Sequence, residues 1–179
     1  MEKFVETERL VLRKLCEEDF ADFCAYAADE EMSRMMGRDV ITDAPSARPT
    51  FDWLVHREPR AYALVLKDSG RVIGNLSVMQ PSETVKECAG AEKKGCALSF
   101  CIGRKYQRKG LMEEAVRAVI AALFAEGMEY INCGNFSFNE ASHALQKKLG
   151  FAPLLREEIE LDDERVAVEE NILWKRDGD

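Results

Sequence analysis

The chain has 179 residues, of which 46% are hydrophobic, and its 33 acidic and 25 basic side chains give a formal net charge of −8 at pH 7. This length predicts one domain over residues 1–179, large enough to bury a core without disulfides or metals. The acidic balance disfavours binding to nucleic acid, whose phosphate backbone needs an excess of positive charge. It is compatible with a cationic partner, and equally with a charge that only maintains solubility.

Membrane, targeting and metal-site signals are not evident in the sequence. No apolar run approaches the roughly 20 residues that span a bilayer, and Met1 to Val5 lacks the basic and apolar regions of a secretory signal. We therefore expect a cytoplasmic protein without membrane association. The six cysteines include no Cys-x-x-Cys pair, and the two histidines complete no metal-ligand spacing. Reduced thiols and no bound metal are expected.

The first elements in chain order are a strand and two helices. Leucines nearly alternate with other residues from Leu10 to Leu15, which indicates a half-buried strand. Apolar residues recur with helical spacing from Glu17 to Ala28, where Asp19 suits an N-cap or a first-turn acid. A second helix is expected from Glu30 to Met36, and its methionines suit a core or a groove lining.

The next segment contains a break, a helix, a hairpin and a loop. Pro45 and Pro49 predict a break before a short helix from Thr50 to Arg57. Two apolar runs within residues 61–79 flank a glycine-containing turn, which predicts a hairpin. Residues 80–95 are polar and nearly patternless, so an exposed loop is expected there.

The second half of the chain alternates strands with helices. Expected strands cover residues 96–102, 130–133, 155–161 and 166–174, with helices after Gly110 and Asn139 and a closing turn at Asp162-Asp163-Glu164. Helices thus precede and interrupt a mostly antiparallel run of strands. We expect an α+β fold with a mixed, mostly antiparallel central sheet flanked by helices.

A basic turn with a glycine joins the expected central strand to the helix that follows it. The segment from Tyr106 to Ala115 reads Tyr-Gln-Arg-Lys-Gly-Leu-Met-Glu-Glu-Ala. The first amides of a helix lack intrahelical partners and carry partial positive charge, so such a turn can hold a pyrophosphate. Alone, the pattern also fits a solvated basic loop.

A second segment agrees with the phosphate interpretation. Asn135-Phe136-Ser137-Phe138-Asn139-Glu140-Ala141-Ser142 is followed by a helix that ends in Leu149-Gly150-Phe151. Together the two segments resemble the GCN5-related N-acetyltransferase (GNAT) superfamily. The opening Glu6-Thr7-Glu8-Arg9-Leu10-Val11-Leu12-Arg13 and the strand Arg71 to Ser77 resemble its branch of ribosomal-protein alanine N-acetyltransferases. The resemblance extends over roughly residues 5–175.

The resemblance implies a GNAT-like acetyl-CoA-binding fold with acetyl-CoA as co-substrate. The pyrophosphate would bind Gln107, Arg108, Lys109, Gly110, Leu111 and Met112, which match the family's Gln/Arg-x-x-Gly-x-Gly/Ala motif. The backbone of Phe100, Cys101 and Ile102 would lie beside the pantetheine arm. Arg104 and Lys105 would reach the outer phosphates or remain exposed basic residues.

Asn139 and Ser142 are the side chains that the resemblance assigns to the thioester end of the cofactor. Asn139 would bond the pantetheine amides, although Asn before a helix is also a common N-cap. Ser142 matches a serine that this branch uses near the thioester sulfur. Its hydroxyl would hydrogen-bond or relay a proton to the departing thiolate, or the position only requires a small residue.

The chain departs from the family's pattern at the proton-transfer positions. Met112 and Arg108 stand where small residues are commonest, and Gln146 replaces a tyrosine that protonates the thiolate in many relatives. Ala97 stands where many members of the branch place a strand glutamate as base. Replacement bases suggested by the sequence are water held by strand carbonyls, Glu83, Glu87 or Glu92 of the expected loop, and His143, which points about 100° away from Ser142 around its helix.

These features predict direct acetyl transfer to a primary amine, either a small molecule or a protein N-terminus, without a covalent enzyme intermediate. An acyl-Cys101 intermediate is the less favoured route because packing explains most buried cysteines. The alternative function is a non-catalytic domain that binds or senses acyl-CoA. Residues 29–57 and 80–95 should line the acceptor side, and a monomer or homodimer is expected.

Overall fold

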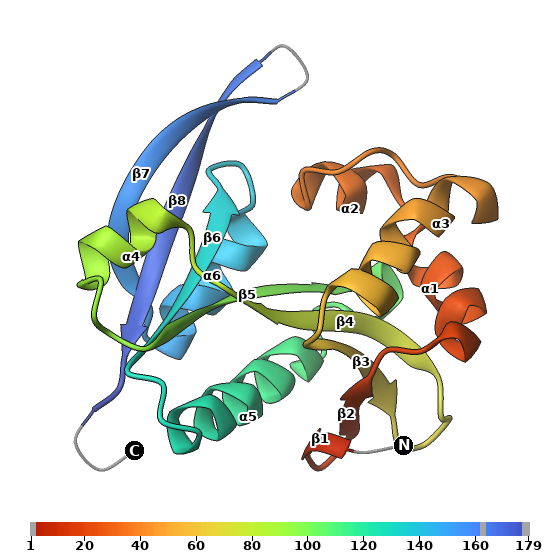
Figure 1. Ribbon diagram of the computed structural model, residues 1–179. Coiled ribbons are helices and arrows are strands. Elements are labelled where there is room, and N and C mark those ends of the chain that lie inside the picture. The colour runs from red at the N-terminus through yellow and green to blue at the C-terminus, as the bar shows by residue number, and fades with distance from the viewer. Residues whose placement is uncertain (1–2, 162–163, 177–179) are drawn as a thin grey trace. The chain divides into compact units, whose positions relative to one another are not determined.

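A computed structural model describes residues 3–161 and 164–176 (Figure 1). The chain divides into two compact units, Met1–Ser77 with Phe100–Val119 and Val78–Ser99 with Ile120–Asp179. Eight strands and the helices between them confirm the expected α+β class with a mixed, mostly antiparallel sheet. No helix within the described ranges is long and apolar enough to cross a bilayer.

The first unit contains an antiparallel series of four strands. Neighbouring strands are β1 (Lys3–Glu6), β2 (Leu10–Lys14), β3 (Ala61–Leu66) and β4 (Val72–Met79), of which β4 ends in the second unit. The predicted strand at Leu10 and the predicted hairpin are confirmed. Gly70 in the hairpin turn has φ +68°, a conformation that glycine adopts without steric cost.

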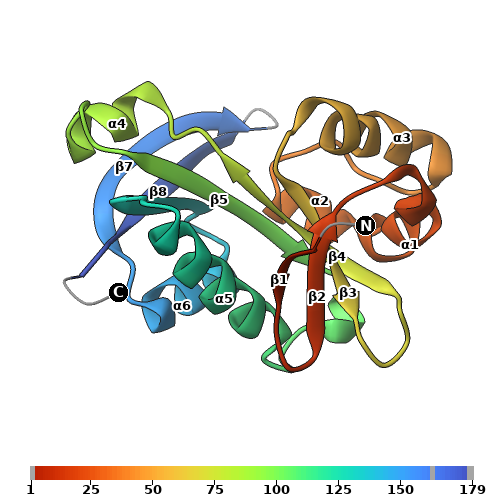
Figure 2. The ribbon, with the colours of Figure 1, turned by 60° about the horizontal axis from the view of Figure 1, so that its bottom comes forward.

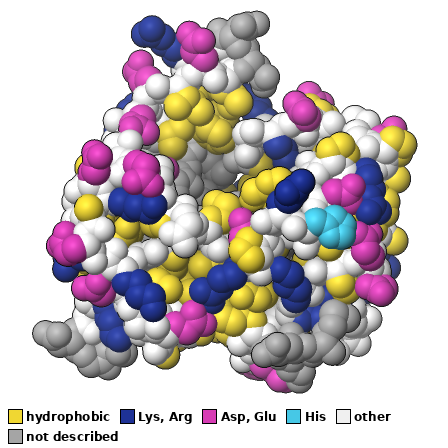
Figure 3. Space-filling model, viewed as in Figure 1, with side chains coloured by type: hydrophobic (Ala, Val, Ile, Leu, Met, Phe, Trp, Pro, Cys, Tyr) yellow, Lys and Arg dark blue, Asp and Glu magenta, His cyan; other side chains and the backbone are white. Residues whose placement is uncertain are grey.

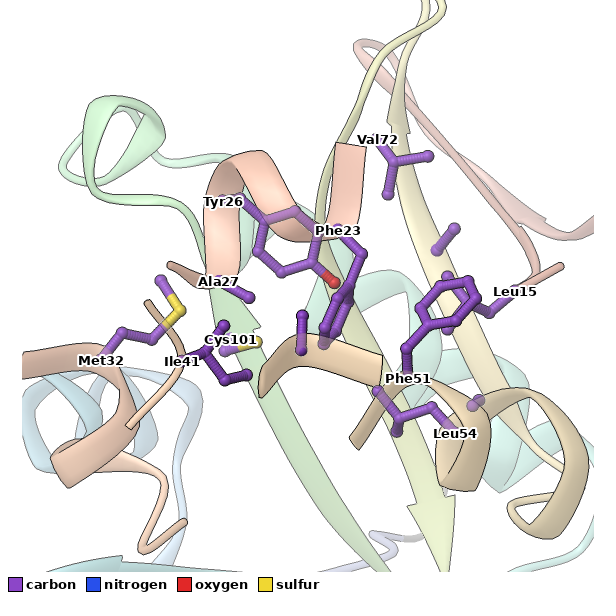
Figure 4. Close-up of a cluster of buried hydrophobic side chains, with 13 residues drawn as sticks. Leu15, Phe23, Tyr26, Ala27, Met32, Ile41, Phe51, Leu54, Val72 and Cys101 are labelled. Carbon is purple, nitrogen blue, oxygen red and sulfur yellow. The ribbon is translucent and has the colours of Figure 1, made fainter. Parts of the chain in front are cut away.

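The helices of the first unit cover its core (Figure 4). A 3₁₀ turn, Glu17–Asp19, leads into α1 (Phe20–Ala27), and α2 (Glu30–Met35) follows with Asp29 as its N-cap. Both predicted helices are therefore confirmed. Phe23 and Phe51 are fully buried, with ring centroids 5.2 Å apart.

The predicted break at Pro45 and Pro49 is wrong, because α3 (Ala44–Asp52) contains both prolines. Asp43 caps the helix by accepting a bond from Ser46, and Pro45 lies in the first turn, where the missing N–H has no intrahelical partner to lose. Burial of Ala47 and Phe51 holds the helix to the core despite Pro49. A π-helical turn, Trp53–Arg57, completes this segment.

The second unit contains the remaining strands. Its neighbours run β5 (Gly95–Ile102), β6 (Tyr130–Phe136), β8 (Glu164–Trp174) and β7 (Ala152–Leu161), with Phe100–Ile102 of β5 belonging to the first unit. β5 and β6 are parallel, whereas β6–β8 and β8–β7 are antiparallel. The expected closing turn includes Asp162 and Asp163, which lie outside the described residues.

The exposed loop expected at residues 80–95 is wrong in part, because it contains α4 (Glu83–Ala89). Ser82 caps this helix by accepting a bond from the Val85 amide at 3.2 Å. Val85 and Ala89, four residues apart, are buried with Tyr130 of β6 and Ile172 of β8, and α4 lies against β7 (Figure 1). The sequence did not predict α4, because two apolar residues with helical spacing are too weak a pattern.

Two further helices complete the fold. α5 (Leu111–Ala125) follows a 3₁₀ turn, Arg104–Tyr106, and α6 (Glu140–Leu149) follows β6 (Figure 2). Both match the predicted helices. Gly150 ends α6 in the left-handed conformation, with φ +91°, as is common for a glycine after a helix.

A buried ion pair links β2 to the turn before α1. The guanidinium of Arg13 donates two bonds to the Asp19 carboxylate, at 2.7 and 2.6 Å, and the Cys16 amide donates a third at 3.0 Å. Burial raises the pKa of the Asp19 carboxyl, but these bonds outweigh burial and the net pKa is lowered. Asp19 therefore stabilises the fold as a carboxylate.

We expect Asp19→Asn to lower the free energy of unfolding at pH 7 by about 2–4 kcal/mol, because it leaves the largely buried Arg13 without its counter-ion. The stabilisation is complete above the unfolded-state pKa of about 3.9 and is lost as pH falls through the lower folded-state pKa. The difference from wild type, measured by denaturant unfolding, should therefore narrow below about pH 4. Exposed Glu18→Gln is the control, and an equal loss in both variants would contradict the assignment.

Candidate active site

The turn between β5 and α5, in the first unit, has the backbone of an anion site. Residues 107–110 are exposed, and Arg108 and Gly110 have φ of 57° and 74°. Arg108 is the non-glycine residue with positive φ among the described residues. Glu114 donates to the Gly110 carbonyl at 3.0 Å, so the amides of residues 111–113 precede the first intrahelical bond and can face a ligand.

Gly110 itself is required by conformation. A Cβ at this position would meet only the Arg9 guanidinium, at 3.5 Å, which is ordinary contact. The positive φ, by contrast, disfavours any L side chain by about 1 kcal/mol or more. Within the turn the Gln107 amide donates to the Arg104 carbonyl at 3.2 Å, so the amides that can meet an anion are those before the first intrahelical bond of α5.

A brace from the N-terminal segment holds this turn in place. Arg9 donates from Nη1 to the Lys109 carbonyl at 2.9 Å, and its Nε pairs with Glu114 at 2.6 Å. Thr7 donates from Oγ1 to the same carboxylate at 2.6 Å. Burial raises the pKa of the Glu114 carboxyl, whereas Thr7 and Arg9 lower it by more, so the net pKa is lowered. Sequence reasoning noted Thr7 and Arg9 only within a resemblance and did not find their contact with the turn.

The basic side chains near the turn have other partners. Arg104 pairs with Asp29 at 2.8 Å and with Glu31 at 2.6 Å, so its charge ties the turn to α2. The expectation that Arg104 either reaches an outer phosphate or remains an exposed basic residue stays a prediction. Lys105 and Lys109 lie over the ring of Tyr106, with Nζ 5.1 and 5.7 Å from the ring centroid.

The end of β5 places Cys101 in a buried polar cluster. The Cys101 thiol donates to Asn75 Oδ1 at 3.0 Å, and Tyr26 donates to the same oxygen at 2.9 Å. A Cβ at Gly74 would lie 2.3 Å from the Cys101 carbonyl oxygen, so only glycine permits this approach of β4 to β5. Burial raises the pKa of the Cys101 thiol. A buried, protonated thiol is a poor nucleophile, which argues against acyl-Cys101.

In the second unit, Asn139 and Ser142 lie together at the start of α6. Asn139 accepts a bond from the Ser142 amide at 3.1 Å, which is the N-cap arrangement. The Ser142 hydroxyl accepts a bond from Gln146 Nε2 at 3.0 Å. Because Gln146 occupies a lone pair of this oxygen, the hydroxyl hydrogen of Ser142 is left to donate elsewhere.

Buried amides fix Gln146 in that orientation. Asn171 of β8 donates from Nδ2 to Gln146 Oε1 at 2.9 Å and to Asn135 Oδ1 at 3.1 Å. All three side chains are buried, and buried amides that satisfy one another have a single arrangement. These bonds fix the side chain of Gln146, which in turn orients the Ser142 hydroxyl through its Nε2. Sequence reasoning found Gln146 and missed Asn135 and Asn171 as its partners.

The bases proposed from the sequence lie in exposed positions. Glu83 is paired with Lys86 at 2.7 Å, and Glu87 and Glu92 are exposed. His143 is about half exposed, with Nδ1 3.4 Å from a carboxylate oxygen of Glu169. β5 itself contains no acidic residue, so a buried carboxylate near Ala97 has to come from another strand.

One such carboxylate, Glu170 on β8, was missed. Asn132 of β6 donates from Nδ2 to Glu170 Oε2 at 2.8 Å. Burial raises the pKa of the Glu170 carboxyl. The hydrogen bond from Asn132 opposes this upward shift, and the negative charge of Glu157 adds to it. The sequence signal was weak, because Glu170 lies in the polar stretch Glu169-Glu170-Asn171 between two apolar triplets of the same strand.

Three side chains of metal-ligand type converge in the first unit, at Glu17, Asp52 and His56. Arg48 already supplies a cation there, because its guanidinium pairs with Glu17 at 3.0 Å and with Asp52 at 2.6 Å. His56 Nε2 lies 2.9 Å from the other oxygen of Glu17. The cluster is an ion-pair network around an arginine on an exposed surface.

A family model for the acetyltransferase (GNAT) domain matches residues 9–152. The chain belongs to the GNAT family. The expectation drawn from the turn and from the Asn139 helix is thereby confirmed at the level of the family.

Similar proteins agree with this membership. The uncharacterized N-acetyltransferase p20 of Bacillus licheniformis is 27% identical over 118 residues, and the match spans 64% of this chain and 62% of p20. A GNAT-family acetyltransferase from Bacillus anthracis superposes with a TM-score of 0.81 at 16% identity, covering 95% of this chain and 97% of that one. The ribosomal-protein-S5-alanine acetyltransferase of Vibrio fischeri superposes with a TM-score of 0.73 at 17% identity, covering 96% and 98%. Both structures show the fold.

We expect Cys101→Ala to keep the rate of acetyl transfer within about threefold of wild type, since the thiolate is the nucleophilic form and burial disfavours it. The cavity left by sulfur should cost about 1 kcal/mol of stability. Steady-state thiol release and denaturant unfolding measure the two effects. A rate loss of a thousandfold or more in a folded variant would show a covalent role.

Proposed function

We propose that this GNAT protein is an acetyl-CoA-dependent N-acetyltransferase that moves an acetyl group directly to a primary amine. The observation that carries the proposal is the turn before α5, where Arg108 and Gly110 adopt positive φ and leave helix-start amides open to an anion. The acceptor is a small-molecule amine or a protein N-terminus. A cytoplasmic location and a monomer or homodimer remain predictions.

Each unit contains residues that are proposed to bind acetyl-CoA. In the first unit, residues 107–112 supply amides for the pyrophosphate, and Phe100, Cys101 and Ile102 supply strand backbone for pantetheine. In the second unit, Asn139 and Ser142 supply side-chain atoms at the start of α6. Asn139 already caps the helix through its oxygen, and its amide nitrogen is the group proposed to meet the cofactor.

Ser142 is proposed to stabilise the leaving sulfur. Acetyl transfer forms a bond from the amine nitrogen to the acetyl carbonyl carbon and breaks the bond from that carbon to sulfur. The departing thiolate needs a hydrogen-bond donor and then a proton. Ser142 offers its hydroxyl hydrogen because Gln146 holds the oxygen as an acceptor, and the proton that reaches sulfur comes from the amine or from water through this hydroxyl.

The acceptor side of the proposal draws on charge and on relatives. Charged side chains of both signs are interspersed on the face shown in Figure 3, while the net charge of the chain is −8. A cationic ammonium is compatible with this balance. The Vibrio fischeri protein of similar fold is described as acting on the alanine of a ribosomal protein, so a peptide with an N-terminal alanine belongs among the acceptors to test.

Release of free CoA thiol distinguishes the enzyme from the rival acyl-CoA sensor. Acetyl-CoA would be incubated with a panel of an alanyl tripeptide, glycine, spermidine and an aminoglycoside. Amine-dependent thiol release supports the proposal. Tight acetyl-CoA binding without thiol release from any of a broad range of primary amines would favour the sensor.

Gly110→Asp is expected to abolish acetyl-CoA binding, because it adds both a side chain at positive φ and a negative charge where the pyrophosphate rests. Gly110→Ala separates the two effects and should weaken binding by about tenfold through backbone strain alone. Isothermal titration calorimetry on folded variants measures both. Unchanged affinity in the aspartate variant would place the pyrophosphate elsewhere.

Ser142→Ala is expected to lower kcat by about tenfold to a hundredfold while acetyl-CoA affinity changes less than threefold, because the group meets charge chiefly as the thiolate forms. Exposed Ser137→Ala, in the turn after β6, is the matched control and should behave as wild type. Equal losses of cofactor affinity and kcat/KM, with kcat unchanged, would assign Ser142 to binding alone.

A further inference from the structure

The position that lacks its usual acid, Ala97, shares a sheet face with a carboxylate from another strand. Ala97 of β5 is in register with Asn132 of β6, and Gly134 of β6 is in register with Glu170 of β8. Residues in register, and residues two apart on a strand, point to the same face. Ala97, Asn132, Gly134 and Glu170 therefore belong to one face of the second unit.

Glycine at 134 makes room for the Glu170 side chain on that face. A Cβ at Gly134 would lie 2.6 Å from Glu170 Oε1, a distance that no real side chain could occupy without displacing the carboxylate. Gly134 is also exposed, and Glu170 is partly exposed. The carboxylate thus lies over the strand backbone at a place that a ligand can reach.

Asn132 orients the Glu170 carboxylate but leaves its own side-chain oxygen without a hydrogen bond to any described residue. Its Nδ2 donates to Glu170 Oε2, whereas its own Oδ1 is buried without a partner among the described residues. A buried unsatisfied oxygen costs about 1–3 kcal/mol, and a catalytic role is one of the explanations for such a group in a native structure. The bond occupies Oε2 and leaves Oε1, beside Gly134, as the oxygen available to a ligand donor.

The surroundings of Glu170 raise the pKa of its carboxyl above that of an ordinary glutamate. The titratable groups that interact with it are Glu157 on β7, whose charge raises the Glu170 pKa, and Cys133 on the opposite face of β6, whose thiol pKa is raised by burial and by the Glu170 charge. Burial is the largest cause of that upward shift. A carboxylate with a raised pKa is a stronger base than an ordinary surface glutamate.

We propose that Glu170 is the general base of the acetyl transfer and binds the acceptor ammonium through Oε1. This rests on the proposed function. Glu170 takes one proton from the ammonium and releases it to water, and the neutral nitrogen then forms its bond to the acetyl carbonyl carbon. As the carbon–sulfur bond breaks, the second proton lost by nitrogen passes to sulfur, with Ser142 donating to the thiolate. A dedicated base thus replaces the water or loop carboxylate expected from the sequence.

The test is Glu170→Gln, compared with Glu169→Gln as a matched control. Gln keeps the shape and an oxygen for Asn132, so the variant should fold. Glu169 is the neighbouring acid on the opposite face, where it contacts His143 and Arg156. With the panel amine that gives the fastest thiol release, we expect Glu170→Gln to lower kcat/KM by about a hundredfold to ten-thousandfold. Acetyl-CoA affinity should stay within twofold, and Glu169→Gln should stay within threefold of wild type.

The pH profile provides a readout that a structural role would not move. A base acts when deprotonated, so wild-type kcat/KM should fall as pH drops through the raised Glu170 pKa. This fall in kcat/KM at low pH should be missing in Glu170→Gln, whose rate should follow only the pKa of the amine. Glu170→Asp should retain part of the activity that Glu170→Gln loses. If Glu170→Gln lowers kcat/KM by less than tenfold and leaves its pH profile unchanged, Glu170 is not the base, although the protein is still an acetyltransferase. Absence of thiol release by wild type would overturn the proposed function and this assignment together.

Discussion

The antiparallel pairing of β6 with β8 is the constraint on which the chemistry of the second unit depends. Its register runs from Tyr130 opposite Trp174 to Phe136 opposite Val168. Successive residues of a strand point to opposite faces, so neighbours Glu170 and Asn171 are separated by the sheet. Asn171 meets the amides that orient Ser142 on one face, and Glu170 lies with Asn132 on the other. A slip of one residue would exchange the two groups.

This separation suits a reaction that removes a proton from one substrate and protonates the other. The face that carries Glu170 continues to Tyr130 and Ile172, which α4 covers, and α4 lies in the segment expected to line the acceptor side. The opposite face carries the α6 network that prepares the Ser142 hydroxyl. The proposed base and the proposed hydrogen-bond donor to sulfur therefore lie on different faces of β6. In the first unit, the brace of Thr7, Arg9 and Glu114 fixes the turn that is proposed to hold the pyrophosphate.

Local patterns were sufficient to predict most helices and strands. The alternation at Leu10, the helical spacing of α5 and the glycine turn each express one local rule, and the structure confirms those elements. Errors arose where tertiary burial decided the outcome. α4 depends on burying Val85 and Ala89, and α3 continues past Pro49 because Phe51 anchors it. The Glu170 carboxylate was missed because its partner Asn132 lies 38 residues away in the sequence. The pairing of β6 with β8 that brings them together could not be predicted from local patterns.

The roles proposed for Glu170 and Ser142 are tested most directly by a crystal structure with a bisubstrate analogue, in which CoA is joined through an acetyl linker to the nitrogen of the best panel amine. We expect this nitrogen to lie within about 3.2 Å of a Glu170 carboxylate oxygen, or one water away, with the Ser142 hydroxyl directed at the sulfur. The pyrophosphate should bond to the amides that open α5. An analogue nitrogen bonded to a different carboxylate, with Glu170 beyond the reach of a single water, would contradict the role proposed for Glu170.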